Sequence, residues 1–593
     1  MKLNKHIILI LIFTLLINFL SPLYAGKDAN RIWMDGEFTD WDTISPIYTD
    51  PSGDQQSGNI DFGTLKITND SRYIYFCIEI GEELNLQDDN EITLYIDTDN
   101  NSATGTEVNG IGAEVEWVFG ERQGNYSFRY TIYHQYIGLV TCPTVTSDKF
   151  EIAVDRTLDI FGQELFPENS FSVVFHDNDS GNDYIPNIGD IITYDFDNTS
   201  LPPIETISLE KSSSADFRIM TYNVLSNNFF ESSLYDEYDR ILSAIQPDII
   251  GFQEIYDKSA NQVKQRVESM IPAGSGEEWY CDTIVGDDVF AVSKYPIIDK
   301  FALNKCGAFL IDFNSKAADE LLLIVAHLSF GNYNTERQLE IDELMAFIRE
   351  AKEPGGTMTL EENTPILITG DLNLVGYAQQ LETLLTGDIV NTQFGPSFSP
   401  DWDGSDFGDL MARQTHLPQF YTWYSETSSY SPGRLDFMIY SDYVLYSENK
   451  FVLFTPEMDA DTLTTYGLQI NDVTSASDHL PLVSDFKIYE PGSVSVSPAN
   501  SKAKIWNSPN PVSKRTTINF IAPNNADNLH LNIFNVKGEK IKSFYLNRNE
   551  KEIQKVTWNC KNARGADVSA GVYLFQLKTN NSYTSGKLVL LKN

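Results

Sequence analysis

The sequence is poor in cysteine and in basic residues. Its five cysteines are too few and too scattered for a disulfide scaffold, and no two of them show the spacing of zinc ligands. Lys and Arg number 42 against 84 Asp and Glu, so the formal net charge is −42. This acidity argues against binding nucleic acid over a broad basic surface, and it suits the binding of cations.

Long apolar runs are also scarce, and the one that stands out lies at the start of the chain. Lys2 and Lys5 precede the apolar stretch Ile7–Leu20, and a small residue, Ala25, follows it. This pattern predicts a secretory signal peptide over residues 1–25. A membrane anchor is the alternative, but the run is short for spanning a bilayer. We therefore expect an exported protein with no transmembrane segment after signal removal.

Shifts in composition divide the rest of the chain into three regions and a linker. Residues 26–203 alternate apolar and polar positions, which predicts an all-β sandwich. Residues 216–487 alternate strand-like and helix-like patterns, which predicts an α/β core. Residues 488–503 are a plausible linker, and the short alternating segments of residues 504–593 predict a small Ig-like β-sandwich.

Polar residues follow or precede the expected strands of residues 216–487. Strand ends of α/β folds are where sites are usually built. Each such residue taken alone is more often a turn or cap residue, whereas their order along the chain is far more specific. The candidates are Asn223, Glu254, His327, Asp371, Asn373, Asp436, Asp478 and His479.

These candidates lie in stretches that resemble the endonuclease/exonuclease/phosphatase superfamily. The matching stretches are Met220–Val224, Gly251–Glu254, Ser293–Pro296, Ala326–Leu328, Gly370–Asn373, Arg434–Phe437 and Ser477–Pro481. The resemblance implies a four-layer α/β sandwich, with two sheets packed face to face and helices outside. It also implies cleavage of a phosphodiester that depends on Mg²⁺ or Mn²⁺.

The resemblance assigns the metal to Glu254, Asp478 and Asn223. Mg²⁺ prefers one or two carboxylates plus waters, so Glu254 is the best first ligand. Asp478 would complete the cluster, and Asn223 would offer a neutral oxygen. The sequence departs from many relatives at Asp287-Asp288, where a Glu-Gly pair is common, and Asp287 is the candidate for orienting His327.

Five catalytic residues follow from the same resemblance. Asp371 would orient or deprotonate the attacking water, and Asn373 would hold that water or the phosphate. His479 would bind a phosphate oxygen, with Asp436 fixing its tautomer. His327 would donate to the phosphate from the other side.

The N-terminal region resembles a family-9-like carbohydrate-binding module, also called DOMON-like. Met34–Asp42 and Tyr95–Asn100 are among the matching stretches. The resemblance implies a structural Ca²⁺ held by oxygens of Asp97, Asp99 and Asn101, and a glycan as partner. A metal-free Asp/Asn-rich turn is the alternative, and core packing is the commoner role for its tryptophans.

The C-terminal region resembles the type IX secretion sorting domain. Asn507–Pro511, Thr557–Asn559 and Ser569–Tyr573 are among the matching residues. The resemblance implies recognition by the type IX secretion machinery, export across the outer membrane, and release or attachment at the cell surface.

Together these features predict a secreted, metal-dependent phosphodiester hydrolase, with an extracellular nuclease acting on DNA or RNA as the first expectation. A sphingomyelinase-like enzyme or another phosphodiesterase or phosphatase is the first alternative. The second alternative is a non-catalytic protein that binds a surface glycan. The intact set of polar residues argues against the second alternative.

Overall fold

The computed structural model describes most of the chain after residue 30. The first described part is residues 31–489, except 180–181, 285, 287 and 314–317. The second described part is residues 504–591, except 509–511, 513, 522–528, 536, 538–539, 547–553, 563–567 and 579–582. The signal peptide, most of the linker and Asp287 lie outside these residues. The chain up to Pro491 forms one compact unit and Gly492–Asn593 a second.

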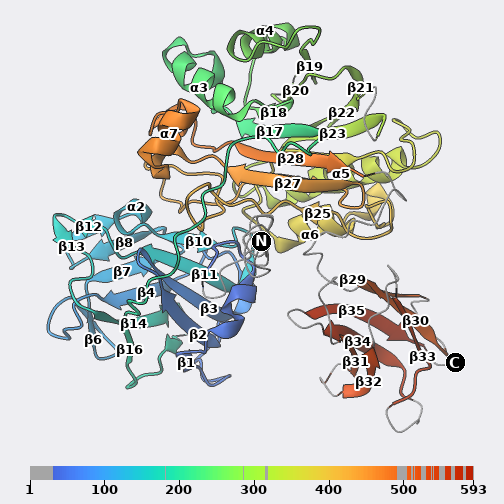
Figure 1. Cartoon of the computed structure of the whole chain (residues 1–593). Helices are drawn as coiled ribbons and strands as arrows, with labels where there is room; N and C mark the ends of the chain where they lie inside the picture. Colours follow the sequence, from blue (N-terminus) through green and yellow to red (C-terminus); the bar gives the residue numbers. More distant parts are fainter. Residues whose placement is uncertain are drawn as a thin grey trace, which may run out of the picture. The chain divides into compact units, whose positions relative to one another are not determined.

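The N-terminal region is a β-sandwich of a five-stranded and a seven-stranded antiparallel sheet (Figure 1). The first sheet has the order β1 (Tyr48–Thr49), β2 (Thr64–Asn69), β3 (Tyr73–Leu84), β11 (Ser147–Asp155), β10 (Val140–Cys142). The second has the order β15 (Tyr184–Ile185), β14 (Ser170–Asp177), β4 (Ile92–Asp97), β7 (Val115–Val118), β8 (Gln123–Tyr126), β9 (Tyr130–Ile132), with β16 (Ile192–Asp195) beside β14. Smaller elements are η1 (Phe38–Thr43), α2 (His134–Ile137) and the hairpins β5–β6 (Thr106–Val108, Ile111–Ala113) and β12–β13 (Asp159–Ile160, Gln163–Glu164).

Alternation of apolar and polar residues produces the core of this sandwich. In β2, Leu65 and Ile67 are buried while their neighbours are half-buried, as the sequence pattern predicts. The tryptophans Trp33, Trp41 and Trp117 are all buried. They therefore fill the interior, which confirms the expectation that packing is their role.

Residues 217–488, called the central region below, contain two six-stranded sheets. One has the order β19 (Tyr280–Thr283), β20 (Phe290–Ser293), β18 (Ile249–Gln253), β17 (Phe217–Asn223), β28 (Leu482–Ile488), β27 (Leu445–Val452), and is called the first sheet below. The other, called the second sheet, has the order β21 (Ile297–Leu303), β22 (Cys306–Asp312), β23 (Glu320–His327), β24 (Ile366–Asp371), β26 (Asp436–Tyr440), β25 (Gly408–Asp409). In both sheets only the third and fourth strands are parallel.

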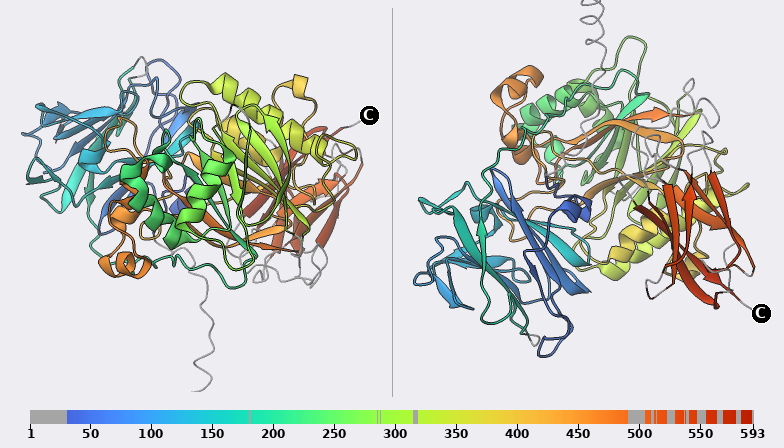
Figure 2. Two further views of the ribbon diagram at one scale, coloured as in Figure 1. Left: turned by 90° about the horizontal axis from the view of Figure 1, so that it is seen from above. Right: turned by 60° about the horizontal axis from the view of Figure 1, so that its bottom comes forward.

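The two sheets pack face to face, with helices on both outer surfaces, which confirms the four-layer α/β sandwich. Gly251 of the first sheet lies against Thr369 and Val325 of the second. Helices α3 (Tyr235–Ile245) and α4 (Ala260–Met270) cover the first sheet, and α5 (Asn334–Ala351) and α6 (Ala378–Thr386) the second (Figure 2, left). Shorter helices are α7 (Ala460–Tyr466), α8 (Asp472–Ala476), and the 3₁₀ turns η2 (Asn228–Phe230), η3 (Ser232–Leu234), η4 (Thr392–Phe394) and η5 (Thr455–Glu457).

Hydrogen bonds and ion pairs join the N-terminal sandwich to the central region. Arg72 forms a bidentate contact with Glu457 at 2.7 and 2.9 Å. The backbone N–H of Met34 donates to the carbonyl of Pro418 at 3.0 Å. The backbone N–H of Thr146 donates to the carbonyl of Gly376 at 2.7 Å. The two regions therefore belong to one unit.

The C-terminal unit is all-β among the described residues. A three-stranded sheet has the order β29 (Lys504–Ser508), β30 (Thr516–Ile521), β33 (Gln554–Trp558), and a four-stranded sheet the order β32 (Lys540–Leu546), β31 (Leu529–Asn535), β34 (Gly571–Lys578), β35 (Tyr583–Leu590). Trp558, Phe575 and Leu588 are buried in its core. Across the described part of the whole chain, we find no helix with the length and apolar character that a membrane span needs.

Candidate active site

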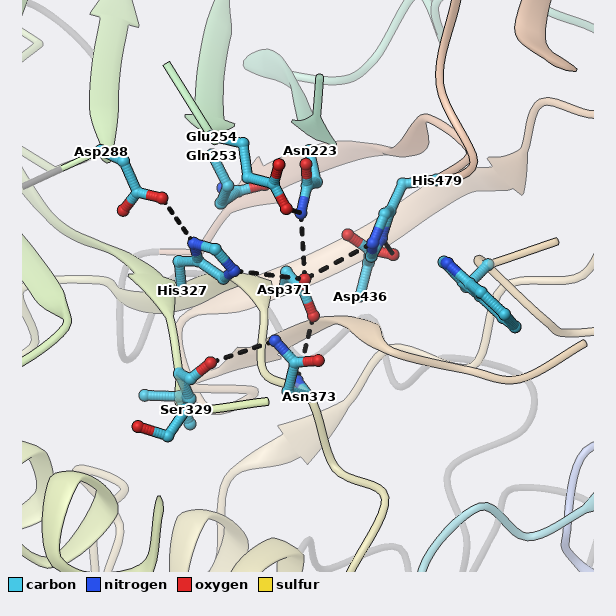
Figure 3. A network of polar contacts seen from close by, with 12 residues as sticks. Asn223, Gln253, Glu254, Asp288, His327, Ser329, Asp371, Asn373, Asp436 and His479 are labelled. Carbon is cyan, nitrogen blue, oxygen red and sulfur yellow. Dashed lines mark hydrogen bonds and ion pairs between the residues drawn. The ribbon is translucent and has the colours of Figure 1, made fainter. Parts of the chain in front are cut away.

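The predicted polar residues meet at one edge of the two stacked sheets. Because β17 and β18 run parallel, Asn223, the last residue of β17, and Glu254, which follows β18, lie at the same edge of the first sheet. Because β23 and β24 run parallel, His327 and Asp371 stand side by side in the second sheet. Figure 3 shows these side chains pointing toward one another around Asp371.

The backbone before Asp371 requires a glycine. Gly370 has a φ of +138°, and a Cβ there would lie 2.0 Å from the carbonyl oxygen of Ala326. Gly370 therefore lets strand β24 pass close to Ala326 of β23 directly before Asp371. The Oδ1 atom of Asp371 then accepts the backbone N–H of Asn373 at 3.0 Å, and its Oδ2 accepts the amide of Asn223 at 3.0 Å. Both oxygens of this carboxylate are thus held in place.

Asn223 bridges the two carboxylates of the site. Its amide nitrogen donates to Glu254 Oε1 at 3.1 Å as well as to Asp371. Its amide oxygen accepts the backbone N–H of Leu225 at 3.0 Å, so the group that faces the carboxylates is the NH₂ rather than the oxygen expected at a cation. Glu254 has a φ of +61° and accepts the backbone N–H of Ser226 at 2.7 Å. A non-glycine residue in this backbone region is uncommon and marks functional sites.

His327 forms the outer of two histidine–aspartate pairs. Its Nδ1 lies 2.7 Å from Asp288 Oδ2, and its Nε2 lies 3.7 Å from Asp371 Oδ2. Asp288 therefore contacts His327, whereas Asp287, the candidate from the sequence, lies outside the described residues. Burial lowers the pKa of His327, but the hydrogen bond with Asp288 and the charges of Asp371 and Asp288 outweigh it and raise the pKa to about 9.

His479 forms the inner pair with Asp436. Its Nδ1 lies 2.8 Å from Asp436 Oδ2, and its Nε2 lies 3.5 Å from Asp371 Oδ2. The side chain of His479 is 7% exposed, against 14% for His327. Burial lowers the pKa of His479, but the charges of Asp436 and Asp371 and the hydrogen bond with Asp436 raise it to about 10. Both imidazoles are therefore cationic at neutral pH.

Asp371 itself lies between these two cations. Burial raises its pKa, while the charges of His479 and His327 act in the opposite direction. Its distances to the two Nε2 atoms are longer than good hydrogen bonds, so each Nε2–H remains available to a further acceptor. The arrangement presents two N–H donors and one carboxylate to the same small volume.

Asn373 and Asp478 occupy less direct positions. Asn373 has a φ of +48°, and its amide nitrogen donates to the carbonyl of Leu328 at 3.0 Å. Asp478 accepts the indole N–H of Trp423 at 3.0 Å through Oδ2. Its Oδ1 is buried and has no hydrogen-bond partner among the described residues. The charge of Asp478 also contributes to the raised pKa of His479.

A cleft of about 1580 Å³ opens above the site. Its lining includes Glu254, His327, Asp371, Asn373 and His479. Exposed aromatic side chains also line it, namely Tyr256, Phe330, Tyr333 and Tyr430. Lys258 and Lys305 add positive charge, and neither forms an ion pair with a described residue. The cleft therefore combines ring surfaces and a few lysines with a larger number of acidic side chains.

None of these aromatic residues was among the candidates expected from the sequence. Trp423 also lines the cleft, whereas Tyr421 is buried. Phe330 and Tyr333 lie in the loop directly after the His327 strand and are 68% and 53% exposed. Aromatic residues in a polar loop next to a catalytic strand end were the available signal.

The N-terminal sandwich supplies one wall of the cleft. Asn85, Gln87, Asp88 and Thr144 all belong to the lining. Gln87 Oε1 accepts the backbone N–H of Ser431 at 2.9 Å, and Asn85 donates to the carbonyl of Val375 at 2.8 Å. This arrangement could not be predicted from the sequence, because no local pattern reports which surfaces of two regions will meet.

The expected calcium residues lie in the sandwich, away from the cleft lining. Carboxylate oxygens of Asp97, Asp99 and Glu114 lie within 4.8 Å of one another. Glu114 is an addition to the predicted set, and its Oε1 is buried without a hydrogen-bond partner among the described residues. The backbone N–H of Asn101 donates to Asp97 and Asp99 at 3.0 Å, so Asn101 holds the turn. A calcium ion at this position stays a prediction.

Comparison with known proteins identifies two regions of the chain. Residues 220–479 match the Endonuclease/Exonuclease/phosphatase family. Residues 507–591 match the Secretion system C-terminal sorting domain. No curated protein matches the chain.

Several solved structures are similar at low sequence identity. The structure of ANGEL2, a 2′,3′-cyclic phosphatase, in complex with adenosine-2′,3′-vanadate is 16% identical, with 47% of this chain and 97% of that chain covered at a TM-score of 0.31. Sphingomyelinase C from Streptomyces griseocarneus is 14% identical, with 45% and 98% covered and a TM-score of 0.29. The AP endonuclease LMAP from Leishmania major is 10% identical, with 48% and 93% covered and a TM-score of 0.26.

The family matches agree with the site and the strand order described above. The endonuclease/exonuclease/phosphatase family is hydrolytic, and the sorting domain indicates export by type IX secretion to the cell surface or the medium. Residues 220–479 of this chain therefore form a domain of the endonuclease/exonuclease/phosphatase family, and residues 507–591 form the sorting domain of an exported protein.

Proposed function

We propose that the protein is an exported, metal-dependent phosphodiester hydrolase and that its substrate is nucleic acid. One observation carries this proposal. Two histidine–aspartate pairs converge on Asp371, and Asn223 links that carboxylate to Glu254. A phosphodiester needs a nucleophile on one side and stabilisation of its negative charge on the other. This cluster offers groups suited to both tasks.

The residues present fit a divalent cation. Glu254 is half-buried at the cleft, and the unpartnered Oδ1 of Asp478 is a second candidate oxygen. Mg²⁺ and Mn²⁺ prefer such carboxylate oxygens together with waters. When bound, the cation would neutralise charge that develops on the phosphate group.

The remaining side chains have separate roles in the proposed reaction. Asp371 orients the attacking water and accepts its proton, which its raised pKa favours. His479 and His327 each donate from Nε2 to a phosphate oxygen, because Nδ1 is engaged by Asp436 or Asp288. Asn373 positions the Asp371 carboxylate through its backbone N–H.

The lining of the cleft favours nucleic acid as substrate. Bases stack on aromatic side chains, and such contacts stabilise single-stranded binding by about 1–3 kcal/mol per base. Phe330, Tyr333, Tyr256 and Tyr430 provide exposed rings at the cleft. Lys258 and Lys305 provide the few cations that a short stretch of backbone needs. An acidic chain would bind a short single strand through these contacts more readily than a long duplex.

A phospholipid headgroup is the second candidate substrate. The same exposed Phe330 and Tyr333 are the kind of aromatic side chains that lie at a membrane–water interface. A sphingomyelinase-like activity would use the same polar residues on a phosphodiester at the membrane surface.

The test is a substrate panel with the purified full chain. Single-stranded DNA, single-stranded RNA, duplex DNA, sphingomyelin vesicles and bis-p-nitrophenyl phosphate are each incubated with Mg²⁺, with Mn²⁺ or with EDTA. We expect EDTA-sensitive cleavage of single strands ahead of duplex, and loss of that cleavage in His479→Gln. Turnover of vesicles without cleavage of nucleic acid would overturn the substrate assignment. Absence of turnover on every substrate would overturn the hydrolase assignment and leave the binding-protein alternative.

A further inference from the structure

A second group of acidic side chains lies in the N-terminal sandwich, apart from the cleft and from the Asp97 cluster. It consists of Asp50, Asp54, Asp61 and Asp183, and one carboxylate oxygen from each lies within 4.8 Å of the others. The first three belong to the connection between β1 and β2, and Asp183 directly precedes β15. The group therefore joins loops that are far apart in the sequence.

Asp50 shows that this group is more than a set of surface acids. Its side chain is buried, with 6% of the residue exposed, and neither of its carboxylate oxygens has a hydrogen-bond partner among the described residues. Burying a carboxylate without a partner is costly. A positive charge at the centre of the group would remove the cost.

The other three carboxylates are already oriented by hydrogen bonds. Asp183 accepts the backbone N–H groups of Phe62 at 2.7 Å and Tyr184 at 2.9 Å. Asp61 accepts the backbone N–H of Gly53 at 2.9 Å, and Asp54 accepts the side-chain amide of Asn187 at 2.9 Å. No Lys, Arg or His of the described chain forms an ion pair with any of the four acids. Protein cations therefore do not balance the group.

We infer that Asp50, Asp54, Asp61 and Asp183 bind a divalent cation with the coordination preferences of Ca²⁺. Ca²⁺ takes six to eight oxygen ligands in flexible geometry, whereas Mg²⁺ requires a tight octahedron and keeps most of its waters. Four carboxylates on two loops, with carbonyls and waters completing the shell, suit the larger ion. A nitrogen or sulfur donor, which transition metals would favour, is absent from the four side chains.

The position of the site gives the cation a structural role. β1 belongs to the five-stranded sheet and β15 to the seven-stranded sheet of the sandwich. A bound ion would tie the edges of the two sheets together at this point. The sandwich in turn forms a wall of the catalytic cleft, so the ion would stabilise that wall without touching the reacting atoms.

The test compares Asp50→Asn with a matched control, Asp148→Asn, an exposed aspartate of the same sandwich. The full chain is stripped with EGTA, and bound Ca²⁺ and the melting temperature are measured with and without added CaCl₂. We expect Ca²⁺, but not equimolar Mg²⁺, to raise the melting temperature of the wild type and of Asp148→Asn. In Asp50→Asn one bound Ca²⁺ per chain should disappear, together with most of the rise. Asp97→Asn is measured in parallel, so that Ca²⁺ lost from the Asp97 cluster is counted separately from Ca²⁺ lost from the Asp50 group.

The stripped proteins provide the sharper result. Asn at position 50 removes like-charge repulsion, so without Ca²⁺ the variant should melt no lower than the wild type. A variant that is destabilised equally with and without Ca²⁺, or that binds as much Ca²⁺ as the wild type, would overturn the inference. If the variant does not fold, limited proteolysis of the wild type decides the question. The loop between β1 and β2 should be cut faster in EGTA than in Ca²⁺, and equal rates would contradict the site.

Discussion

The two sheets of the catalytic domain share one pattern of strand pairing but carry different side chains at the edge where the site lies. Each sheet has six strands, and only its third and fourth strands are parallel. At equivalent strand ends the first sheet carries Asn223 and Glu254, and the second carries Asp371 and His327. The pairing pattern thus fixes where side chains meet, whereas the residue types decide what they can do there.

Each histidine–aspartate pair joins the two sheets. The histidine comes from the second sheet in the outer pair and from the first sheet in the inner pair. In the outer pair His327 ends a strand of the second sheet, and Asp288 precedes a strand of the first. In the inner pair His479 precedes a strand of the first sheet, and Asp436 begins a strand of the second. The protonation of both imidazoles therefore depends on how the sheets pack.

The largest effect should come from the inner pair. His479→Gln removes the more buried cation, and we expect kcat to fall by about 10³-fold, within the range for a lost acid–base group. His327→Gln should cost about 10²-fold, because that imidazole is more exposed and water can replace part of its role. Steady-state kinetics on the preferred substrate measures both. Equal falls in kcat, or a larger fall in His327→Gln, would show that burial of the histidine does not determine its contribution to kcat.

Substitution of Asp288 or Asp436, the partners of the two histidines, should change the pH dependence of kcat/KM. The pKa of His327 is raised to about 9, so its cation persists up to that pH and is lost as the pH rises through it. Asp288→Asn removes an opposite charge and should move the alkaline limb of kcat/KM down by about 1–3 pH units. Asp436→Asn should likewise lower the pH at which kcat/KM falls because His479 loses its proton. An alkaline limb that stays in place in both variants would mean that neither imidazolium is required.

A residue between the sheets should affect stability and activity together. A Cβ at Gly251 would lie 3.3 Å from the methyl groups of Thr369 and Val325. We expect Gly251→Val to lower the free energy of unfolding by about 1–3 kcal/mol through overpacking. Because both pairs cross between the sheets, kcat should fall as well. Gly251→Ala with Thr369→Ser, which restores space, is the control; a stable but equally inactive double variant would argue against the packing explanation.

The smallest effect should come from the wall that the N-terminal sandwich contributes. Gln87→Ala removes a hydrogen bond to Ser431, a contact of about 0.5–1.5 kcal/mol. We expect KM to rise by about 2–10-fold on a long substrate, with kcat unchanged. The exposed Gln163→Ala serves as the control. An unchanged KM would show that this wall does not contact the substrate.

Much of the fold and the central residues of the site followed from the sequence, because they depend on local patterns. The helix Tyr235–Ile245 buries Tyr238, Ile241, Leu242 and Ile245, whose spacing of three and four residues is the helix-like pattern of this region, and the strand Ile249–Gln253 follows it. Glu254, His327, Asp371 and His479 were predicted because each follows or precedes a strand. Alternation and helical periodicity report such elements directly.

Other features depend on contacts between distant segments and could not be read from the sequence. The contact between Asp288 and His327 joins the loop before β20 to the end of β23, two segments that lie 39 residues apart in the sequence. Gln87 belongs to the cleft only because the sandwich packs against Ser431. Asp50 becomes buried beside Asp183, more than a hundred residues later, through the pairing of the two sheets of the sandwich.

The most direct test of the central claim is the dependence of hydrolysis on divalent metal in the wild type and in Glu254→Gln. Cleavage of single-stranded DNA is measured over a titration of Mg²⁺ after treatment with EDTA. We predict no turnover without metal, and at least a tenfold higher Mg²⁺ concentration for half-maximal activity in Glu254→Gln, the range seen when metal sites lose a supporting group. Full activity in EDTA, or an identical Mg²⁺ dependence in the two proteins, would contradict the account.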